Sequence, residues 1–301
     1  MGETVEMEEQ QKIQSISQFI EEVNSIEIKS EMRMFPPKLL FRGQSWTNFK
    51  LVPSLGRYPS QHWLNSWTSV EKDLVQSAQQ KFPLLFPDTD YPVILLAKLQ
   101  HYGIYTRMLD LTENALIALY FSCNKNEDRD GEVLAFQASV CSAYDPIANI
   151  VADTYRLTSN AMTTVENYYF RAMNRPYSSR LLYPERKDDM RRGIEHLIES
   201  TQKPIFLEVG TVCERQKNQG GYFAIFPSQI CEGEVIADTL IKFSKDDSSV
   251  VKRLIIDKNS KATIIEQLKR FGITKEFLFA DDVDTVLKGI IDEQRKRYPE
   301  S

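Results

Sequence analysis

The sequence predicts an α+β fold, with a mixed or antiparallel central sheet, N-terminal and C-terminal helices, and a helical insertion near residues 141–200. Apolar residues recur at helical spacing near both ends, and short strand-like runs lie between and among the helices. The two kinds of element do not alternate regularly, as they would in a doubly wound parallel sheet. We expect residues 1–30 to form an N-terminal helix and 31–301 a single domain, with 141–200 variable and partly helical.

Helices are predicted where apolar residues follow steps of three and four. Residues 12–27 show this spacing, and residues 69–82 are also expected to be helical. A helix is expected from Pro92 to Gly103, where proline suits the first turn and glycine the C-terminal cap. Beyond a turn at 106–112, Thr112 is the expected N-cap of a buried helix. The last two predicted helices are 260–272 and 281–297.

Strands are predicted for five short apolar runs. The first is "PPKLLFRG", where Pro36 and Pro37 prevent a helix from continuing. The others are residues 131–136, 204–209, 221–226 and 250–257. They are separated by helical segments and by irregular stretches, so the sheet is built from distant parts of the sequence.

Composition excludes several classes of protein. The 301 residues are 42% hydrophobic and 26% charged, which is typical of a soluble globular chain. A net charge of −5 gives no overall basic field for nucleic acid or anionic membranes. No apolar run approaches the roughly 18 residues of a membrane span. The N-terminus is acidic and lacks a signal-peptide pattern, and the four cysteines and three histidines are scattered. These features predict a cytoplasmic protein without membrane contact or metal site.

Three stretches combine polar residues with tight apolar framing. They are Phe41-Arg42-Gly43-Gln44, the segment Gln100–Thr112, and the run 214–227, "ERQKNQGGYFAIFP". Together with Pro53–Arg57 and the helix segment Ala118–Phe121, they resemble the motifs of the FRG domain family, named for Phe-Arg-Gly. The resemblance spans most of residues 39–290, the C-terminal strand and helix included. It implies a mostly bacterial and phage context, and so a phage defence or toxin setting.

A fainter similarity links the first half of the sequence to arginine-specific ADP-ribosyltransferases. An arginine-glycine ends an early strand, and a Thr-rich turn then precedes an Ala-x-x-Phe helix and a further strand. In those enzymes the arginine holds a phosphate of NAD, so this likeness implies NAD as a substrate. The Ser-Thr-Ser strand is missing here, and Glu232-Gly233-Glu234 is the counterpart of their ExE loop.

The expected roles of the first two stretches have structural alternatives. Arg42 could bind a phosphate or carboxylate bidentately, with Gly43 letting a ligand approach and Gln44 beside it. It could instead form an internal ion pair with Asp110, with Gly43 closing a turn. His101 follows Gln100 at the end of a helix, where it could contact an anion or donate a proton. A histidine that only caps the helix fits the same position.

Thr106 and Arg107 could form a phosphate pocket with Arg42 and a helix N-terminus. The same residues, with Asp110, would also suit an ordinary turn that leads into a helix. Gln219 could orient a ribose, or it could be a loop residue. Ribosyl transfer would also need a carboxylate against the positive charge of its transition state, for which Glu214, Glu232 and Glu234 are candidates.

The segment 168–192 mixes basic and aromatic residues. Seven arginines and lysines, among them Arg171, Arg175 and Arg180, lie among tyrosines. Such a pattern can hold single-stranded nucleic acid. We favour the alternative, an exposed helix pair whose tyrosines pack on the core, because the chain is acidic overall.

The first hypothesis is therefore an FRG-family protein that binds a nucleotide-like ligand such as NAD in an arginine-lined cleft, with transferase or glycohydrolase chemistry. The expected ligand-binding residues are Arg42, Gly43, Gln44, Gln100, Thr106, Arg107 and Asp110, and the expected catalytic residues are His101, Gln219 and Glu234. The second hypothesis is a non-catalytic sensor or interaction module that recognises nucleic acid or a protein partner. In the third, the motif residues only hold the fold together.

Overall fold

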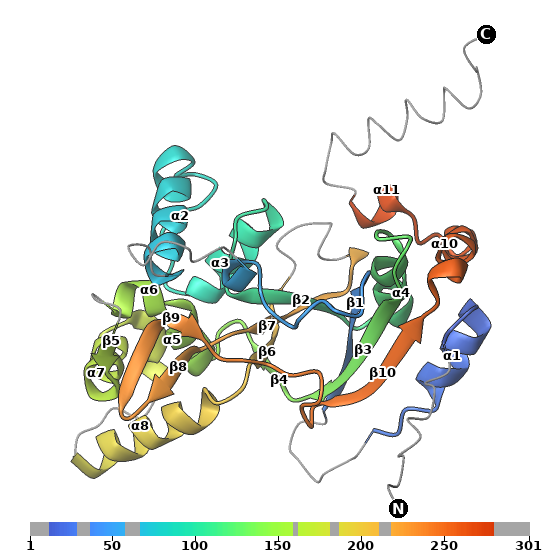
Figure 1. The fold of residues 1–301 in the computed structure, drawn as a ribbon. Helices are drawn as coiled ribbons and strands as arrows, with labels where there is room; N and C mark the ends of the chain where they lie inside the picture. Colours follow the sequence, from blue (N-terminus) through green and yellow to red (C-terminus); the bar gives the residue numbers. More distant parts are fainter. Residues whose placement is uncertain are drawn as a thin grey trace, which may run out of the picture. The chain divides into compact units, whose positions relative to one another are not determined.

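A computed structural model describes the fold of the chain (Figure 1). Its contacts divide the chain into two compact units. Unit 1 contains residues 1–49, 112–137 and 248–301, and unit 2 contains 50–111 and 138–247. The residues described are 12–28, 37–57, 67–158, 162–180, 187–210 and 218–279. Helices and strands are interspersed in both units, so the predicted α+β class is confirmed. The single-domain interpretation of residues 31–301 stays a prediction.

Unit 1 contains three strands in the order β10-β3-β1. They are β1 (Lys38–Gln44), β3 (Gly131–Ala138) and β10 (Val250–Ile256), and each matches a predicted strand. Strands β3 and β10 are antiparallel, with Val133 opposite Leu254. Phe41 of β1 pairs with Thr112, which is the last residue of a further strand.

The helices of unit 1 cover this sheet with apolar faces. They are α1 (Ile16–Asn24), α4 (Ala115–Cys123), α10 (Lys261–Arg270) and α11 (Lys275–Leu278), with a 3-10 turn η3 (Lys258–Ser260) before α10. Buried residues of α1, α4 and α10 join those of the strands in one core. Figure 1 shows α4 beside β1 and β3. The predicted helix 281–297 lies outside the described residues.

One predicted cap in unit 1 is wrong. The N-cap of α4 is Asn114, whose side chain accepts hydrogen bonds from the backbone N–H groups of Leu116 and Ile117. Thr112 belongs to a strand, and its hydroxyl accepts from the N–H of Asn114. Thr112 thus supports the capping residue without being the cap, two residues before the helix begins.

Unit 2 contains a mixed sheet with strand order β2-β7-β6-β4. Its strands are β2 (Met108–Thr112, the last residue of which belongs to unit 1), β4 (Val140–Ser142), β6 (Ile205–Glu208) and β7 (Gly221–Ile225). Strands β6 and β7 are antiparallel, whereas β4 and β6 are parallel. A second, antiparallel sheet contains β5 (Met162–Thr164), β9 (Glu234–Leu240) and β8 (Ser228–Cys231).

The helices of unit 2 include the expected pair α2 (Trp67–Lys81) and α3 (Pro92–His101). Gly103 has a φ of 82°, which suits the predicted glycine stop of α3. The insertion near 141–200 is largely helical, as expected. It contains α5 (Pro146–Ala152), α6 (Thr154–Leu157), α7 (Val165–Met173), η2 (Pro176–Arg180) and α8 (Lys187–Ser200). The remaining short turn is η1 (Leu55–Arg57).

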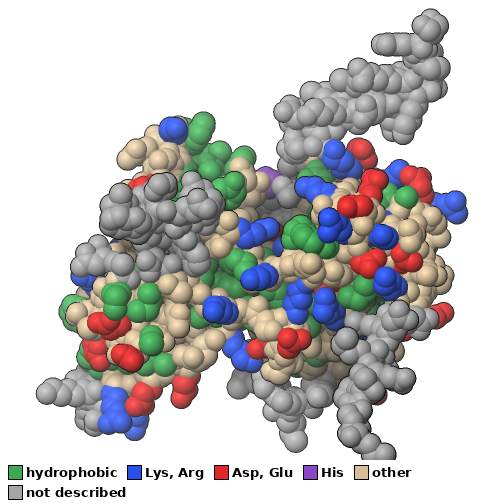
Figure 2. All heavy atoms as spheres, in the orientation of Figure 1, with side chains coloured by type: hydrophobic (Ala, Val, Ile, Leu, Met, Phe, Trp, Pro, Cys, Tyr) green, Lys and Arg blue, Asp and Glu red, His purple; other side chains and the backbone are tan. Residues whose placement is uncertain are grey.

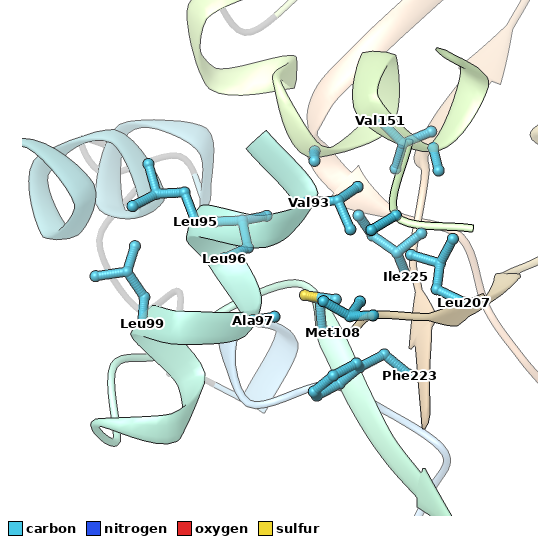
Figure 3. Close-up of a cluster of buried hydrophobic side chains, with 14 of the residues drawn as sticks. Val93, Leu95, Leu96, Ala97, Leu99, Met108, Val151, Leu207, Phe223 and Ile225 are labelled. Atoms are coloured by element: carbon cyan, nitrogen blue, oxygen red, sulfur yellow. The ribbon is translucent and has the colours of Figure 1, made fainter. Parts of the chain in front are cut away.

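The core of unit 2 lies between α3 and the mixed sheet. Val93 of α3 points towards Ile225 and Leu207, whereas Leu95 and Leu99 project from the other side of the helix (Figure 3). Met108 of β2 is buried in the same cluster. Because α3 is apolar on more than one side, it is a buried helix with its C-terminal end at the surface, where Tyr102 is exposed.

The strand β2 replaces the turn predicted for residues 106–112. Four of its five residues are buried, and Asp110 alone is exposed. A run of this length with an acid at its centre resembles a loop when it is considered by itself. Its strand conformation comes from neighbouring strands that are distant in sequence.

Candidate functional site

Gly43 lies within β1 and packs directly on helix α4. A Cβ atom at this position would be 1.8 Å from the carbonyl oxygen of Ala118. At Gly131, the first residue of β3, a Cβ would be 2.3 Å from the carbonyl oxygen of Ser122. The two glycines let the backbone of α4 approach both strands. The space at Gly43 is thus filled by a helix, which corrects the expectation that it admits a ligand or closes a turn.

Gln44 is buried beside an ion pair within unit 1. In the orientation that satisfies both ends of its amide, the nitrogen donates to the carbonyl oxygen of Phe49 (3.0 Å) and to Glu132 Oε1 (2.9 Å). The other oxygen of Glu132 accepts from Arg253 Nε at 2.7 Å, and Glu132 is fully buried. These contacts give Gln44 a structural role in place of the expected ligand contact. The neighbouring Arg42 is half-buried.

In unit 2, Gln100, Thr106 and Asp110 form one hydrogen-bonded row, which we call the Asp110 row. The Gln100 side-chain nitrogen donates to Asp110 Oδ1 at 2.7 Å, and the Thr106 hydroxyl donates to Gln100 Oε1. Thr106 is fully buried and Asp110 is exposed. Gln100, which links the two by hydrogen bonds, is half-buried. The row thus leads from the interior to a carboxylate at the surface. It joins three of the predicted ligand-binding residues.

Ser54 fixes the buried end of the Asp110 row. The backbone N–H of Thr106 donates to Ser54 Oγ at 3.1 Å, and the N–H of Leu55 donates to the Thr106 carbonyl at 3.1 Å. The Thr106 hydroxyl also accepts from the N–H of Met108 at 3.1 Å. Part of the Pro53–Arg57 motif therefore serves to hold Thr106. Our interpretation of the sequence gave Ser54 no role.

Arg107 points into the interior of unit 2 and is fully buried. Its Nε lies 3.0 Å from both carboxylate oxygens of Glu71 on α2, and its Nη2 lies 2.6 Å from Glu71 Oε2. Burial disfavours its charge, but the Glu71 carboxylate outweighs this effect and raises the pKa of Arg107 above its ordinary value. A guanidinium in this environment has no surface to offer to a phosphate. We therefore assign Arg107 a structural role instead of the expected ligand contact.

The position of Glu71 in the sequence indicated that it is buried and paired, which our interpretation missed. Glu71, Val75 and Ala78 follow one another at steps of four and three along α2, and all three are buried. An acid on the apolar stripe of an amphipathic helix requires a buried partner, because an unpaired buried charge is very costly. The sequence could thus have predicted that Glu71 has a basic partner, although not which one.

Aromatic side chains surround the C-terminal end of α3. The Tyr102 ring is 53% exposed and makes edge contacts with Phe86 and His101, at centroid distances of 5.5 and 4.8 Å. Tyr105 is also exposed. His101 is half-buried. The segment that contains the Asp110 row therefore also presents an imidazole and an exposed, oriented aromatic ring.

The other two predicted catalytic residues belong to different elements. Gln219 is half-buried and precedes Gly220, whose φ is 53°, just before β7. Glu234 is the first residue of β9 and pairs with Cys231 across a two-residue hairpin turn. Both turn residues, Glu232 and Gly233, have positive φ values of 50° and 79°, as a tight β-hairpin requires. The ExE-like sequence is therefore a hairpin turn. Glu214 and Arg215 lie outside the described residues.

Described tyrosines of the basic and aromatic segment pack on the core, as we favoured. Tyr168, Tyr169 and Tyr177 are buried. Arg175 donates from Nε to the fully buried Asp153 at 2.9 Å, and Arg171 donates to the carbonyl oxygen of Leu157 at 2.9 Å. Three of the aromatic rings are thus not available for stacking on bases. The side chain of Arg180 lies outside the described residues.

The rest of the described surface adds little to this site. Within the described ranges, no group of three or more His, Cys, Asp or Glu residues is placed to hold a metal. None of the described helices combines the length and the apolar character needed to cross a membrane. Both acidic and basic side chains lie on the face drawn in Figure 2.

The protein is thus an α+β protein in which residues of the Gln100–Thr112 motif form a polar site that reaches the surface at Asp110. Residues 37–131 match the family model described as FRG domain. This part of the chain is therefore similar to an FRG domain, as its motifs predicted. No curated protein and no solved structure matches the chain.

Proposed function

We propose that the chain binds a nucleotide-like ligand at the Gln100–Asp110 segment of the part that matches the FRG domain. The observation that carries the proposal is the exposed Asp110 carboxylate, which Gln100 orients from a row fixed on the buried Thr106. A carboxylate accepts hydrogen bonds only, so its natural partners are ligand hydroxyl and amino groups such as those of a ribose or a base. An oriented carboxylate also binds with less loss of side-chain entropy.

The neighbouring side chains complement such a ligand. The exposed face of Tyr102 can stack on a base, and an N–H of the His101 imidazole can donate to a phosphate oxygen. Arg42 as a phosphate ligand remains a separate prediction, since its strand belongs to unit 1. Arg107 has no part in this proposal.

NAD is the nucleotide that the motif pattern favours as a substrate. We propose that bound NAD undergoes transferase or glycohydrolase chemistry, in the cytoplasm and in a phage defence or toxin setting. In the simplest case, water attacks the ribose carbon, the bond to nicotinamide breaks, and nicotinamide, ADP-ribose and the proton lost by the water are released. A carboxylate stabilises the positive charge that develops on the ribose. Asp110 is the exposed carboxylate of the segment, whereas Glu234 lies in the second sheet.

The proposal is tested by calorimetric titration of ADP and NAD into the full chain. We expect Asp110→Asn to weaken binding at least tenfold, since a hydrogen bond to a charged group contributes about 1.5–3 kcal/mol. Asp73→Asn, which changes an exposed carboxylate on α2 of the same unit, is the matched control and should bind as the wild type does. Equal affinities for the two variants would contradict the site. Arg42→Ala in the same titration tests the separate prediction for Arg42.

Release of nicotinamide from NAD separates catalysis from binding. Turnover that Asp110→Asn abolishes would support the enzyme. Binding without turnover, and without transfer of labelled ADP-ribose to a cell extract, would support a non-catalytic sensor instead. The packing of the tyrosines in the 168–192 segment gives nucleic-acid recognition no support.

A further inference from the structure

We infer that Glu71 and Arg107 are positioning residues that hold the Asp110 row in its binding geometry. Neither side chain reaches the surface, since their exposed fractions are 1% and 0%. This inference depends on the proposed function, because it assigns the two residues to the same ligand site. It differs from the expectation that Arg107 itself contacts the ligand.

Arg107 connects several elements of unit 2. Its guanidinium binds Glu71 of α2 with two of its nitrogens. The third nitrogen donates to Thr154 Oγ1 of α6 at 3.3 Å and lies 3.5 Å from Ser228 Oγ of β8. Its backbone carbonyl accepts from the N–H of Phe226 at 3.0 Å. Contacts with several elements fix both the side chain and the backbone of this residue.

The fixed backbone of Arg107 adjoins Thr106, the buried residue of the Asp110 row. Thr106, its direct neighbour, supplies the hydroxyl that orients Gln100, and that hydroxyl also accepts from the N–H of Met108 on the other side of Arg107. A change in the backbone at residue 107 therefore moves the hydroxyl, then the Gln100 amide, then the Asp110 carboxylate. The path from Glu71 to Asp110 consists of one ion pair, one peptide link and two hydrogen bonds.

Stability alone gives a weak reason for this ion pair. Removing two charges from water costs about as much as their attraction returns, and apolar residues of similar volume often stabilise a fold equally well. A bidentate arginine–carboxylate pair adds a fixed orientation, which apolar packing does not provide. This fixed orientation matters for the site because Arg107 is the direct neighbour of Thr106.

The test compares two isosteric variants of buried carboxylates in unit 2. Glu71→Gln weakens the positioning pair, and Asp153→Asn weakens a second buried cluster. In that cluster Asp153 accepts from Arg175 Nε and from the Tyr177 hydroxyl, both at 2.9 Å. Both variants are expected to lower the midpoint of thermal unfolding. Only Glu71→Gln should weaken ADP binding, at least fivefold, whereas Asp153→Asn should bind ADP as the wild type does.

Amide hydrogen exchange provides a readout that does not depend on a ligand. The N–H groups of Thr106 and Met108, which donate to Ser54 Oγ and Thr106 Oγ1, should exchange at least ten times faster in Glu71→Gln. Asp153→Asn should leave them unchanged. If Glu71→Gln does not fold, Glu71→Asp, which keeps the charge but shortens the side chain, takes its place.

The outcomes separate the two proposals. Wild-type chain that binds neither ADP nor NAD overturns the proposed function, and faster exchange confined to Glu71→Gln then still supports the positioning of the row. Equal loss of affinity in the two variants, or equal exchange at Thr106 and Met108, overturns the positioning role and leaves the proposed function standing.

Discussion

A Cβ atom on Gly43 would lie 1.8 Å from the carbonyl oxygen of Ala118, well inside any tolerated contact. The glycine of the Phe-Arg-Gly motif is therefore required by the approach of helix α4 to strand β1. The adjacent Gln44 is buried beside Glu132 for a related reason, because it satisfies polar groups in the same core. Two of the four residues in Phe41–Gln44 are thus explained by packing and hydrogen bonding within unit 1.

Replacing Gly43 with alanine should destabilise unit 1 strongly. The added methyl group meets backbone atoms of α4, which cannot rotate away, so either strand or helix must move. Overpacking of this kind costs roughly 3 kcal/mol. Chemical denaturation followed by circular dichroism measures the loss. Gly210→Ala is the control, since its added Cβ would meet no atom within 4 Å, and an equal loss in both variants would contradict the packing argument.

Lys261 of helix α10 should contribute strongly to stability, because its side chain is buried. It is only 1% exposed, and its ammonium group donates to the carbonyl oxygens of Ser45, Lys125 and Asn126 at 2.7, 3.1 and 2.9 Å. Burial lowers its pKa below the ordinary value. Lys261→Met would leave the three carbonyl oxygens without this donor, at a cost of about 3 kcal/mol.

The exposed Lys275 provides the control for Lys261 within the same unit. Lys275→Met should change the free energy of unfolding by less than about 0.5 kcal/mol. The same denaturation experiment measures both variants. A Lys261→Met protein as stable as the wild type would show that these carbonyl oxygens find other donors.

Stability should decrease in alkaline solution because of Cys123. Burial raises the pKa of its thiol from 9.0 to about 11. Below pH 9 the thiol is protonated in both the folded and the unfolded chain, so its contribution is fully present. Between pH 9 and 11 the unfolded chain loses this proton first, which favours unfolding as the pH rises. The slope is about 1 kcal/mol per pH unit.

Denaturation of the wild type and of Cys123→Ala at several pH values isolates the contribution of this thiol. The difference between their free energies of unfolding should be constant below pH 9. Between pH 9 and pH 11 the free energy of unfolding of the wild type should fall relative to that of Cys123→Ala. A difference that stays constant up to pH 11 would mean that Cys123 does not remain protonated in the folded state.

Tyr102 should matter for ligands that contain a base. Tyr102→Ala removes the exposed ring from the end of α3, and base stacking on an aromatic side chain contributes about 1–3 kcal/mol. We expect ADP to bind at least fivefold more weakly and ribose 5-phosphate to bind unchanged. Tyr144→Ala is the matched control, because Tyr144 is 47% exposed and makes a similar edge contact with Tyr91. Weaker binding of ribose 5-phosphate to Tyr102→Ala would contradict stacking as the cause.

The elements that depend on local pattern could be predicted from the sequence. The steps of three and four before Asn24 indicated α1, and the glycine at 103 ended α3 at the expected place. The strands β1, β3 and β10 were also predicted, since each is a short apolar run bounded by breakers. In such segments the local preference and the tertiary structure agree.

Relationships between distant residues could not be predicted in the same way. The partner of Arg107 is 36 positions away, and nothing in a single sequence connects the two. Arg107 was therefore expected to contact a phosphate of the ligand. The strand β2 was missed for a similar reason, because its conformation comes from strands that are remote in sequence. For Asp110 the prediction of a binding role remains a prediction, with an exposed carboxylate and a defined hydrogen bond now in its support.

The pairing of β3 with β10 has a consequence for how the chain folds during synthesis. Arg253 of β10 donates a hydrogen bond from Nε to Glu132 of β3, and the two residues are 121 positions apart. When β3 leaves the ribosome, its partner strand has not yet been made, and the intervening residues include most of unit 2. Closing so long a loop is also slow, because chain entropy must be lost before the contacts form. The apolar side chains of β3 are therefore not covered by β10 until that strand is made, so early termination between the two strands should yield aggregates.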